Sequence, residues 1–170
     1  MNALARMTAD EVVRHLQLQP LTIEGGLFNE VYRAAAPAAT AVPRCCATII
    51  YYLLRAGQRS AFHRVAADEI WLFVAGQPAA QLLITPDDRC HELILGPALD
   101  AGQVLHHVMP AGSWQTTMLV TADPAAWALF ACVVAPGFDY ADFTAGTDAE
   151  LCGMYPRHAA RIRAWCARAG

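Results

Sequence analysis

Two short segments contain most of the polar side chains in this chain that could carry out chemistry. The first is residues 59–71, with the sequence RSAFHRVAADEIW, and the second contains the adjacent histidines His106 and His107. Because an imidazole changes its charge near neutral pH, a histidine oriented by a carboxylate can act as a general base. His63 is therefore the candidate base, and Glu69 is its candidate orienting partner, a metal ligand or the partner of an arginine.

The pair His106–His107 admits two interpretations. Neighbouring residues of a strand point to opposite faces, so only one of these histidines can face the interior. If His106 faces His63 and Glu69, the three side chains form a set of two histidines and one carboxylate, which suits a transition metal. Otherwise one histidine is exposed and the other caps a loop carbonyl. The sequence therefore leaves two cofactor predictions, either none or one divalent metal ion.

These side chains must be positioned by strands, because residues 21–143 read mainly as short extended runs separated by turns rich in Gly, Pro and Asp. The predicted runs are 27–33, 46–54, 69–75, 81–85, 91–95, 103–109, 116–120 and 127–134. Many short strands at near-regular spacing predict an all-β fold, an antiparallel barrel or sandwich.

A short helix is expected at each end of the strands. Thr8 and Glu11 have the spacing of a capping box and precede apolar residues at helical spacing, which predicts a helix over about 9–18. A second helix is predicted over about 156–167, where a proline in the first turn is favourable. No linker or repeat is visible, so residues 1–170 are expected to form one domain.

The composition restricts the partners. Hydrophobic residues make up 56% of the chain and charged residues 16%, which excludes general disorder. A net charge of −3 leaves no basic surface for nucleic acid. No apolar run reaches the roughly 20 residues that span a membrane, and the N-terminus does not resemble a signal peptide, so we expect a cytoplasmic protein without a membrane partner. So much apolar sequence also predicts burial between the subunits of a homodimer.

The residues that several classes of enzyme require are absent from this sequence. All 12 basic residues are arginines, which excludes lysine Schiff bases and a P-loop lysine. Ser60 and Ser113 are the only serines, and neither lies in a Gly-x-Ser-x-Gly motif. The six cysteines show no Cys-x-x-Cys pair or zinc spacing, so we expect reduced thiols without a catalytic role.

The two polar segments resemble the two motifs of the cupin superfamily. His63, Glu69 and Gly76 match the first histidine, the glutamate and the closing glycine of the first motif, and Pro110 and Gly112 match the second motif. The resemblance implies a jelly-roll β-barrel of the cupin (RmlC-like) type. It also places His63 in a pocket at the mouth of that barrel.

A closer resemblance, to the DUF985 or cupin-5 family, covers nearly the whole chain. Its marks are EGG at 24–26, SAFHR at 60–64, DEIW at 68–71, PAGSWQ at 110–115 and VAPGFDYADF at 134–143. So many landmarks in one order are specific for the fold. They do not specify a reaction, because cupins bind metals, sugars, nucleotides and small acids on one architecture.

Departures from these two patterns affect whether the chain has enough ligands to bind a metal ion. Val65 stands at the second histidine of the metal-binding cupins and Gln115 at the last, which leaves His63 and Glu69. Catalytic zinc sites, for comparison, use three protein ligands. The chain also departs from the DUF985 pattern at Thr22-Ile23, at Asn29 and at 105–107, and His106 aligns there with a glutamine of the family.

The resemblance implies further pocket residues. Metal-free sugar-epimerase cupins pair a histidine base with a tyrosine acid, and by analogy Tyr51 is the candidate acid here. An apolar cavity with a few polar groups suits a small organic ligand. The residues expected to bind it are Phe62, Arg64, Trp71, Trp114, Gln115 and Glu30.

Three functions remain open, each with a small molecule as partner. The first is an enzyme of proton-transfer chemistry (isomerisation, epimerisation, cyclisation or lyase action) with His63 as base, Glu69 as its partner and Tyr51 or His106 as acid. The second is metal-dependent catalysis at His63, Glu69 and His106. The third is a non-catalytic binding protein.

Overall fold

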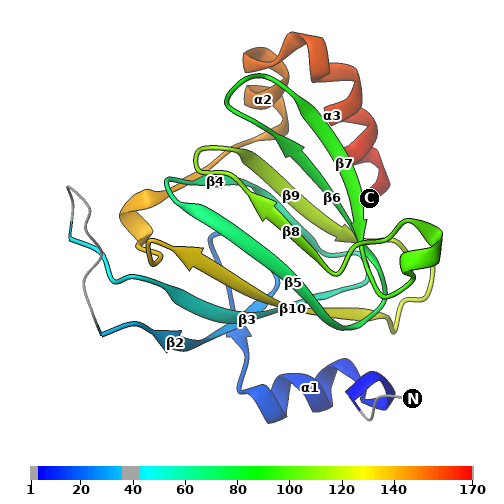
Figure 1. Cartoon of the computed structure of the whole chain (residues 1–170). Helices are drawn as coiled ribbons and strands as arrows, with labels where there is room; N and C mark the ends of the chain where they lie inside the picture. Colours follow the sequence, from blue (N-terminus) through cyan, green and yellow to red (C-terminus); the bar gives the residue numbers. More distant parts are fainter. Residues whose placement is uncertain (1–3, 36–42, 170) are drawn as a thin grey trace.

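Two antiparallel sheets face each other in this computed structural model, which describes residues 4–35 and 43–169 (Figure 1). The six-stranded sheet consists, in spatial order, of β1 (Gln19–Pro20), β2 (Leu27–Arg33), β3 (Thr48–Arg55), β10 (Trp127–Ala135), β5 (Asp68–Gly76) and β8 (His106–Met109). The five-stranded sheet consists of β11 (Phe143–Ala145), β4 (Arg59–Val65), β9 (Trp114–Leu119), β6 (Ala79–Ile84) and β7 (Cys90–Leu95). The prediction of an all-β barrel is confirmed.

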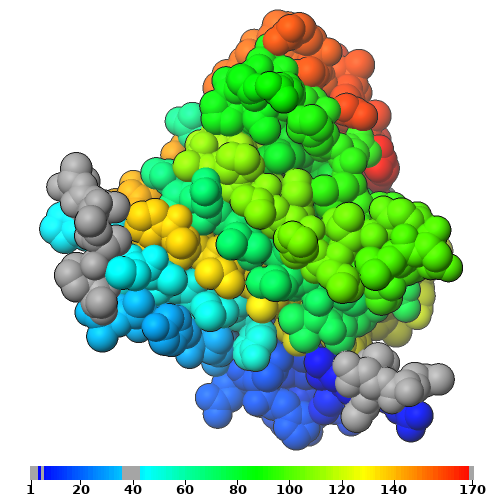
Figure 2. Space-filling model, viewed as in Figure 1, coloured from blue at the N-terminus to red at the C-terminus, as the bar shows by residue number. Residues whose placement is uncertain are grey.

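Short helices precede, connect and follow the strands. They are η1 (Leu4–Arg6), α1 (Ala9–Leu16), η2 (Leu99–Ala101), η3 (Tyr140–Asp142), α2 (Asp148–Met154), η4 (Pro156–His158), α3 (Ala159–Cys166) and η5 (Ala167–Ala169). Helix α1 lies against the six-stranded sheet, whereas α2 and α3 lie against the five-stranded sheet, at the opposite end of the molecule (Figure 2). No helix in the described part of the chain is long and apolar enough to cross a membrane.

The helix predictions hold with small differences in their bounds. The capping box of Thr8 and Glu11 is formed at the start of α1, and the helix ends where Gln17 adopts a left-handed conformation. The expected C-terminal helix corresponds to η4 followed by α3. Helix α2 was not predicted, although Thr147 and Glu150 form a second capping box at its start.

The predicted strands differ from the structure at β8 and at β4. The run predicted over 103–109 is too long, because Val104 bonds to Ile94 and Gly96 near β7, and β8 begins only at His106. The predicted runs omit β4, since its charged and polar residues interrupt the apolar pattern. The run predicted over 27–33 coincides with β2.

Three apolar clusters result from this layering. The central one lies between the sheets, where the indole of Trp71 contacts the rings of Tyr52 and Phe130 with centroids 5.4 and 5.2 Å apart. A second cluster joins Phe62 and Trp114 of the five-stranded sheet to α2 and α3. The third joins the six-stranded sheet to α1. The central cluster closes one end of the barrel interior and leaves the other end for a cavity.

Candidate functional site

A cavity lies at the open end of the barrel, lined by β2, β3, β4, β5, β10 and the chain that follows β10. Its volume is about 80 Å³. Its apolar walls are formed by Leu21, Ile23, Phe28, Ile50, Val65, Val134, Phe138, Tyr140 and Phe143. A small organic molecule fits such a space.

His63 is the central polar residue of the cavity. Its side chain is buried, and Nδ1 lies 2.8 Å from the carbonyl oxygen of Ala61. A carbonyl only accepts hydrogen bonds, so Nδ1 carries the proton of the neutral ring and Nε2 is left with its lone pair. The ring stacks on Phe143 with centroids 5.3 Å apart, which holds its orientation.

Glu24 is the carboxylate beside the free nitrogen of His63. Its Oε2 lies 3.7 Å from Nε2, close enough for an ion pair when the imidazole is protonated. Its other oxygen, Oε1, accepts a hydrogen bond of 2.7 Å from the hydroxyl of Ser60. The Glu24 carboxylate is therefore fixed within reach of the base.

A turn formed by Gly25 and Gly26 positions Glu24 beside His63. Gly25 and Gly26 have φ values of +97° and +69°, a region that residues with a Cβ rarely adopt. A Cβ on Gly26 would also lie 2.8 Å from the ring of Tyr52. The turn docks on β4, because the amide of Ala61 donates to the carbonyl of Glu24 at 2.7 Å.

Glu69 is the second carboxylate of the cavity and is almost completely buried. Gln115 donates a hydrogen bond of 2.6 Å from Nε2 to Oε2 of Glu69. Burial raises the pKa of Glu69, since water no longer stabilises the charged form, and Glu24 raises it further, whereas His63 acts in the opposite direction. Glu69 thus keeps a proton to higher pH than an exposed glutamate.

Two other buried groups beside the cavity stay in their neutral forms. The hydroxyl of Tyr52 donates to the carbonyl of Gly25 at 2.9 Å, and burial raises its pKa well above the usual value. Burial, with the nearby carboxylates, also raises the pKa of Cys132. Tyr52 therefore supports the glycine turn, and Cys132 acts as a small apolar wall residue, as the sequence indicated.

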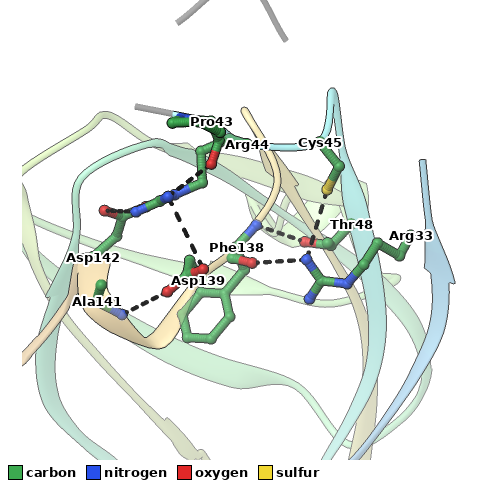
Figure 3. Close-up of polar contacts among 9 residues, drawn as sticks. All are labelled: Arg33, Pro43, Arg44, Cys45, Thr48, Phe138, Asp139, Ala141 and Asp142. Atoms are coloured by element: carbon green, nitrogen blue, oxygen red, sulfur yellow. Dashed lines mark hydrogen bonds and ion pairs between the residues drawn. The ribbon is translucent and has the colours of Figure 1, made fainter. Parts of the chain in front are cut away.

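The aromatic rim of the cavity is held by two arginines (Figure 3). Arg33 donates to the carbonyl of Phe138 at 3.1 Å and forms two hydrogen bonds with Glu30. Arg44 pairs with Asp142 through two hydrogen bonds of 2.7 and 2.9 Å. These contacts fix the segment that carries Phe138, Tyr140 and Phe143 against β2 and β3.

The structure brings together part of the predicted site. His63, Glu69 and Glu30 line the cavity, and Gln115 lies directly behind Glu69. Trp71 belongs to the central apolar cluster and not to the cavity lining. The predicted polar centre is thus present, with Gln115 as a supporting residue.

The other predicted residues lie elsewhere, because strand alternation turns them away. Phe62 and Trp114 pack under α2 and α3, and Arg64 stacks over Trp114 with its guanidinium 4.9 Å from the ring centroid. Tyr51 packs toward α1, on the opposite face of β3 from Tyr52. The expectation that these four residues border the pocket does not match their positions.

His106 also lies outside the cavity. It is exposed opposite Leu72 on the outer face of β8, so it cannot complete a ligand set with His63 and Glu69. Its neighbour His107 is the inward-facing histidine, and its Nδ1 lies 3.1 Å from Oε1 of Gln81. His107 therefore belongs to a polar network away from the cavity.

The residues present do not fit a metal site. Within the described ranges, no group of three or more His, Cys, Asp and Glu side chains is arranged to hold a metal ion. Val65 offers no ligand atom, and the amide of Gln115 is directed at Glu69. We therefore derive no chemistry through a metal.

Sequence reasoning missed Glu24 as a site residue, since the segment EGG at 24–26 serves there only as a mark of the family resemblance. The motif EGG at 24–26 is the available signal, because an acidic residue before two glycines can be brought close to another strand. Its partner could not be identified, because the contact between Glu24 and His63 depends on how the turn docks on β4.

Comparison with known proteins identifies one family, through a match to a family model and through two similar solved structures. The family described as "Cupin superfamily (DUF985)" matches residues 10–146. A hypothetical protein from Leishmania major is 32% identical, with 92% of this chain and 97% of that chain covered and a TM-score of 0.84. A protein from Shewanella oneidensis is 33% identical, with 92% and 96% covered and a TM-score of 0.82. The resemblance found in the sequence is confirmed.

More distant structures share the fold alone. Oxalate decarboxylase from Bacillus subtilis is 11% identical, with 78% of this chain and 33% of that chain covered and a TM-score of 0.53. No curated protein matches the chain. Function must therefore be argued from the cavity itself.

Proposed function

The chain belongs to the DUF985 family of the cupin superfamily, and on that premise we propose that it is an enzyme that transfers protons on a small organic molecule bound in the cavity. The reaction class is an isomerisation, epimerisation, cyclisation or elimination. The observation that carries the proposal is the placement of one imidazole and two carboxylates in a small cavity with apolar walls. Such sites combine a base and an acid in a space that excludes most water.

His63 is the base in this proposal. The carbonyl of Ala61 holds the ring proton on Nδ1, so the lone pair on Nε2 is available to a ligand. When Nε2 takes up a proton, the positive ring lies beside the carboxylate of Glu24. That carboxylate stabilises the imidazolium, and it replaces Glu69 in the role that the sequence suggested.

Glu69 is the proton donor in this proposal. Burial raises its pKa, so a larger fraction of its side chains carries a proton at a given pH than in an exposed glutamate. Gln115 holds the carboxyl group in place through its hydrogen bond to Oε2. A base beside an acid whose pKa is raised by burial can move a proton onto one ligand atom and off another.

Exchange of carbon-bound protons in D₂O tests this function with a panel of candidate substrates. Small carbonyl compounds, amines and polyols are incubated with the protein, and proton NMR records the loss of C–H signals. We expect the wild-type protein to exchange at least one compound, His63→Gln to lose the exchange, and the exposed control His106→Gln to keep it. Exchange that persists in His63→Gln would contradict the proposal. A compound that binds beside His63 without exchange would favour a binding protein instead.

We also propose a cytoplasmic homodimer. Leu72, Leu105 and Val108 are exposed apolar residues around the edge strand β8, which supports burial by a second copy. Sedimentation of the wild type and of Val108→Glu tests the dimer, which the added charge should weaken.

A further inference from the structure

We infer that the ligand of the cavity is a small organic cation, an amine bound as its ammonium ion. This inference rests on the proposed function in taking the cavity as the ligand site, and it adds the chemical class of the ligand. Three observations support it: the charges of the groups beside His63, the hydrogen bonds that Arg33 already forms, and the aromatic rings in the cavity walls.

The charged groups beside His63 favour a positive ligand. Glu24 and Glu69 both line the cavity, with His63 as the neighbouring titratable group. If His63 is neutral and both carboxylates are ionised, these groups carry two negative charges. If Glu69 and His63 are both protonated, the imidazolium and Glu24 cancel. As long as Glu24 is ionised, these three groups are negative or neutral and never positive.

The arginine of the cavity is not available to an anion. Arg33 is the only arginine among the described lining residues, and Glu30 accepts hydrogen bonds of 2.8 and 2.6 Å from its Nε and Nη2. Its Nη1 donates to the carbonyl of Phe138. A ligand carboxylate would therefore have to compete with Glu30 for the N–H groups of Nε and Nη2.

The walls of the cavity suit an ammonium ion. Phe28, Phe138, Tyr140 and Phe143 contribute aromatic rings to the lining of the cavity. The face of an aromatic ring attracts a cation, by about 0.5–1 kcal/mol at exposed sites and more where water is excluded. A negative charge in the same space would instead be repelled by Glu24, and also by Glu69 whenever that side chain is ionised, and poor hydration would strengthen the repulsion.

Three compounds with similar carbon skeletons and different charges test the inference. The compounds are isobutylammonium, isobutanol and isobutyrate, which carry a positive charge, no charge and a negative charge at neutral pH. Affinity is measured by NMR titration at pH 7.5, with the ring signals of His63 reporting the site. We expect isobutylammonium to bind at least about tenfold more tightly than isobutyrate. Equal or tighter binding of isobutyrate would overturn the inference.

A pair of charge-neutralising variants tests the role of Glu24. Glu24→Gln should weaken isobutylammonium binding at least about tenfold, because it removes a partly desolvated partner charge. Asp100→Asn removes the same charge from an exposed residue of η2 outside the cavity lining and should change the affinity less than about twofold. Unchanged ammonium affinity in a folded Glu24→Gln protein would count against the inference. The comparison of the three compounds needs only the wild type and stands if the variant does not fold.

The outcomes separate this inference from the proposed function. Binding of isobutanol or isobutyrate beside His63, without preference for the cation, overturns the ligand class and leaves the cavity as the site. If none of the three compounds shifts the signals of His63, both the ligand class and the assignment of the cavity as a ligand site are contradicted.

Discussion

Nε2 of His63 lies 3.7 Å from Oε2 of Glu24, although Glu24 belongs to a glycine turn before β2 and His63 belongs to β4 of the other sheet. The other ring nitrogen is occupied by the carbonyl of Ala61. The carboxylate therefore stands on the same side of the ring as the free lone pair. A ligand that gives its proton to His63 must enter the space next to Glu24.

The first prediction concerns Glu24. Glu24→Gln should lower the rate of C–H exchange by about ten- to hundredfold, because a protonated His63 loses the carboxylate that stabilises it. The amide can still accept the hydrogen bond of Ser60, so the fold should be retained. The measurement is the exchange rate in D₂O as a function of pH. An unchanged rate and pH profile would remove Glu24 from the mechanism.

The second prediction concerns the stability cost of Glu69. Burial raises its pKa above the usual value of 4.5, so between these two pKa values the folded protein holds a proton that the unfolded chain has lost. Stability therefore falls as the pH rises through that window. Glu69→Gln should raise the melting temperature at pH 8 more than at pH 4 and should lower the exchange rate. Equal changes at both pH values would contradict the raised pKa of Glu69.

The third prediction separates backbone strain from docking of the glycine turn. Gly26→Ala and Gly57→Ala both place an alanine at a similar positive φ, +69° and +75°, at a cost of about 1–2 kcal/mol. Only at Gly26 would the new Cβ meet Tyr52 and the carbonyl of Leu53, since no atom lies within 4 Å at Gly57. Gly26→Ala should be the more destabilising change in urea denaturation and should reduce exchange activity, whereas Gly57→Ala should keep that activity.

The fourth prediction concerns acid stability. Burial, with contributions from His91 and His106, lowers the pKa of His107 from 6.5 to about 4. Between these values the unfolded chain binds a proton that the folded protein does not, so stability is lost as the pH falls from 6.5 towards 4. His107→Asn should reduce the difference between urea midpoints at pH 7 and pH 5, and the exposed control His106→Asn should reduce it less. The opposite order would show that His107 is not the group responsible.

How well a feature could be predicted depends on how far apart in the sequence its interacting residues lie. Local patterns predicted β2 and the capping box of Thr8, because these depend on neighbouring residues. The position of His63 and Glu69 in one cavity followed from the family resemblance. The choice between His106 and His107 and the face on which Tyr51 lies depended on strand phase, where a shift of one residue exchanges the two faces.

Long-range docking explains the remaining misses. The approach of Glu24 to His63 requires the glycine turn to pack on β4, which no local pattern encodes. Phe62 and Trp114 suit a pocket by residue type alone. They became core residues because α2 and α3 cover that face of the five-stranded sheet.

The protonation state of each ring nitrogen of His63 decides whether this residue can act as the base. ¹⁵N NMR of histidine-labelled protein measures it, with the signals assigned by their loss in His63→Gln. We expect the neutral form of the ring to carry its proton on Nδ1 and none on Nε2, and we expect the Nε2 signal to shift when a ligand enters the cavity. A neutral ring protonated on Nε2 would contradict the proposed function, because His63 would then offer no base to the cavity.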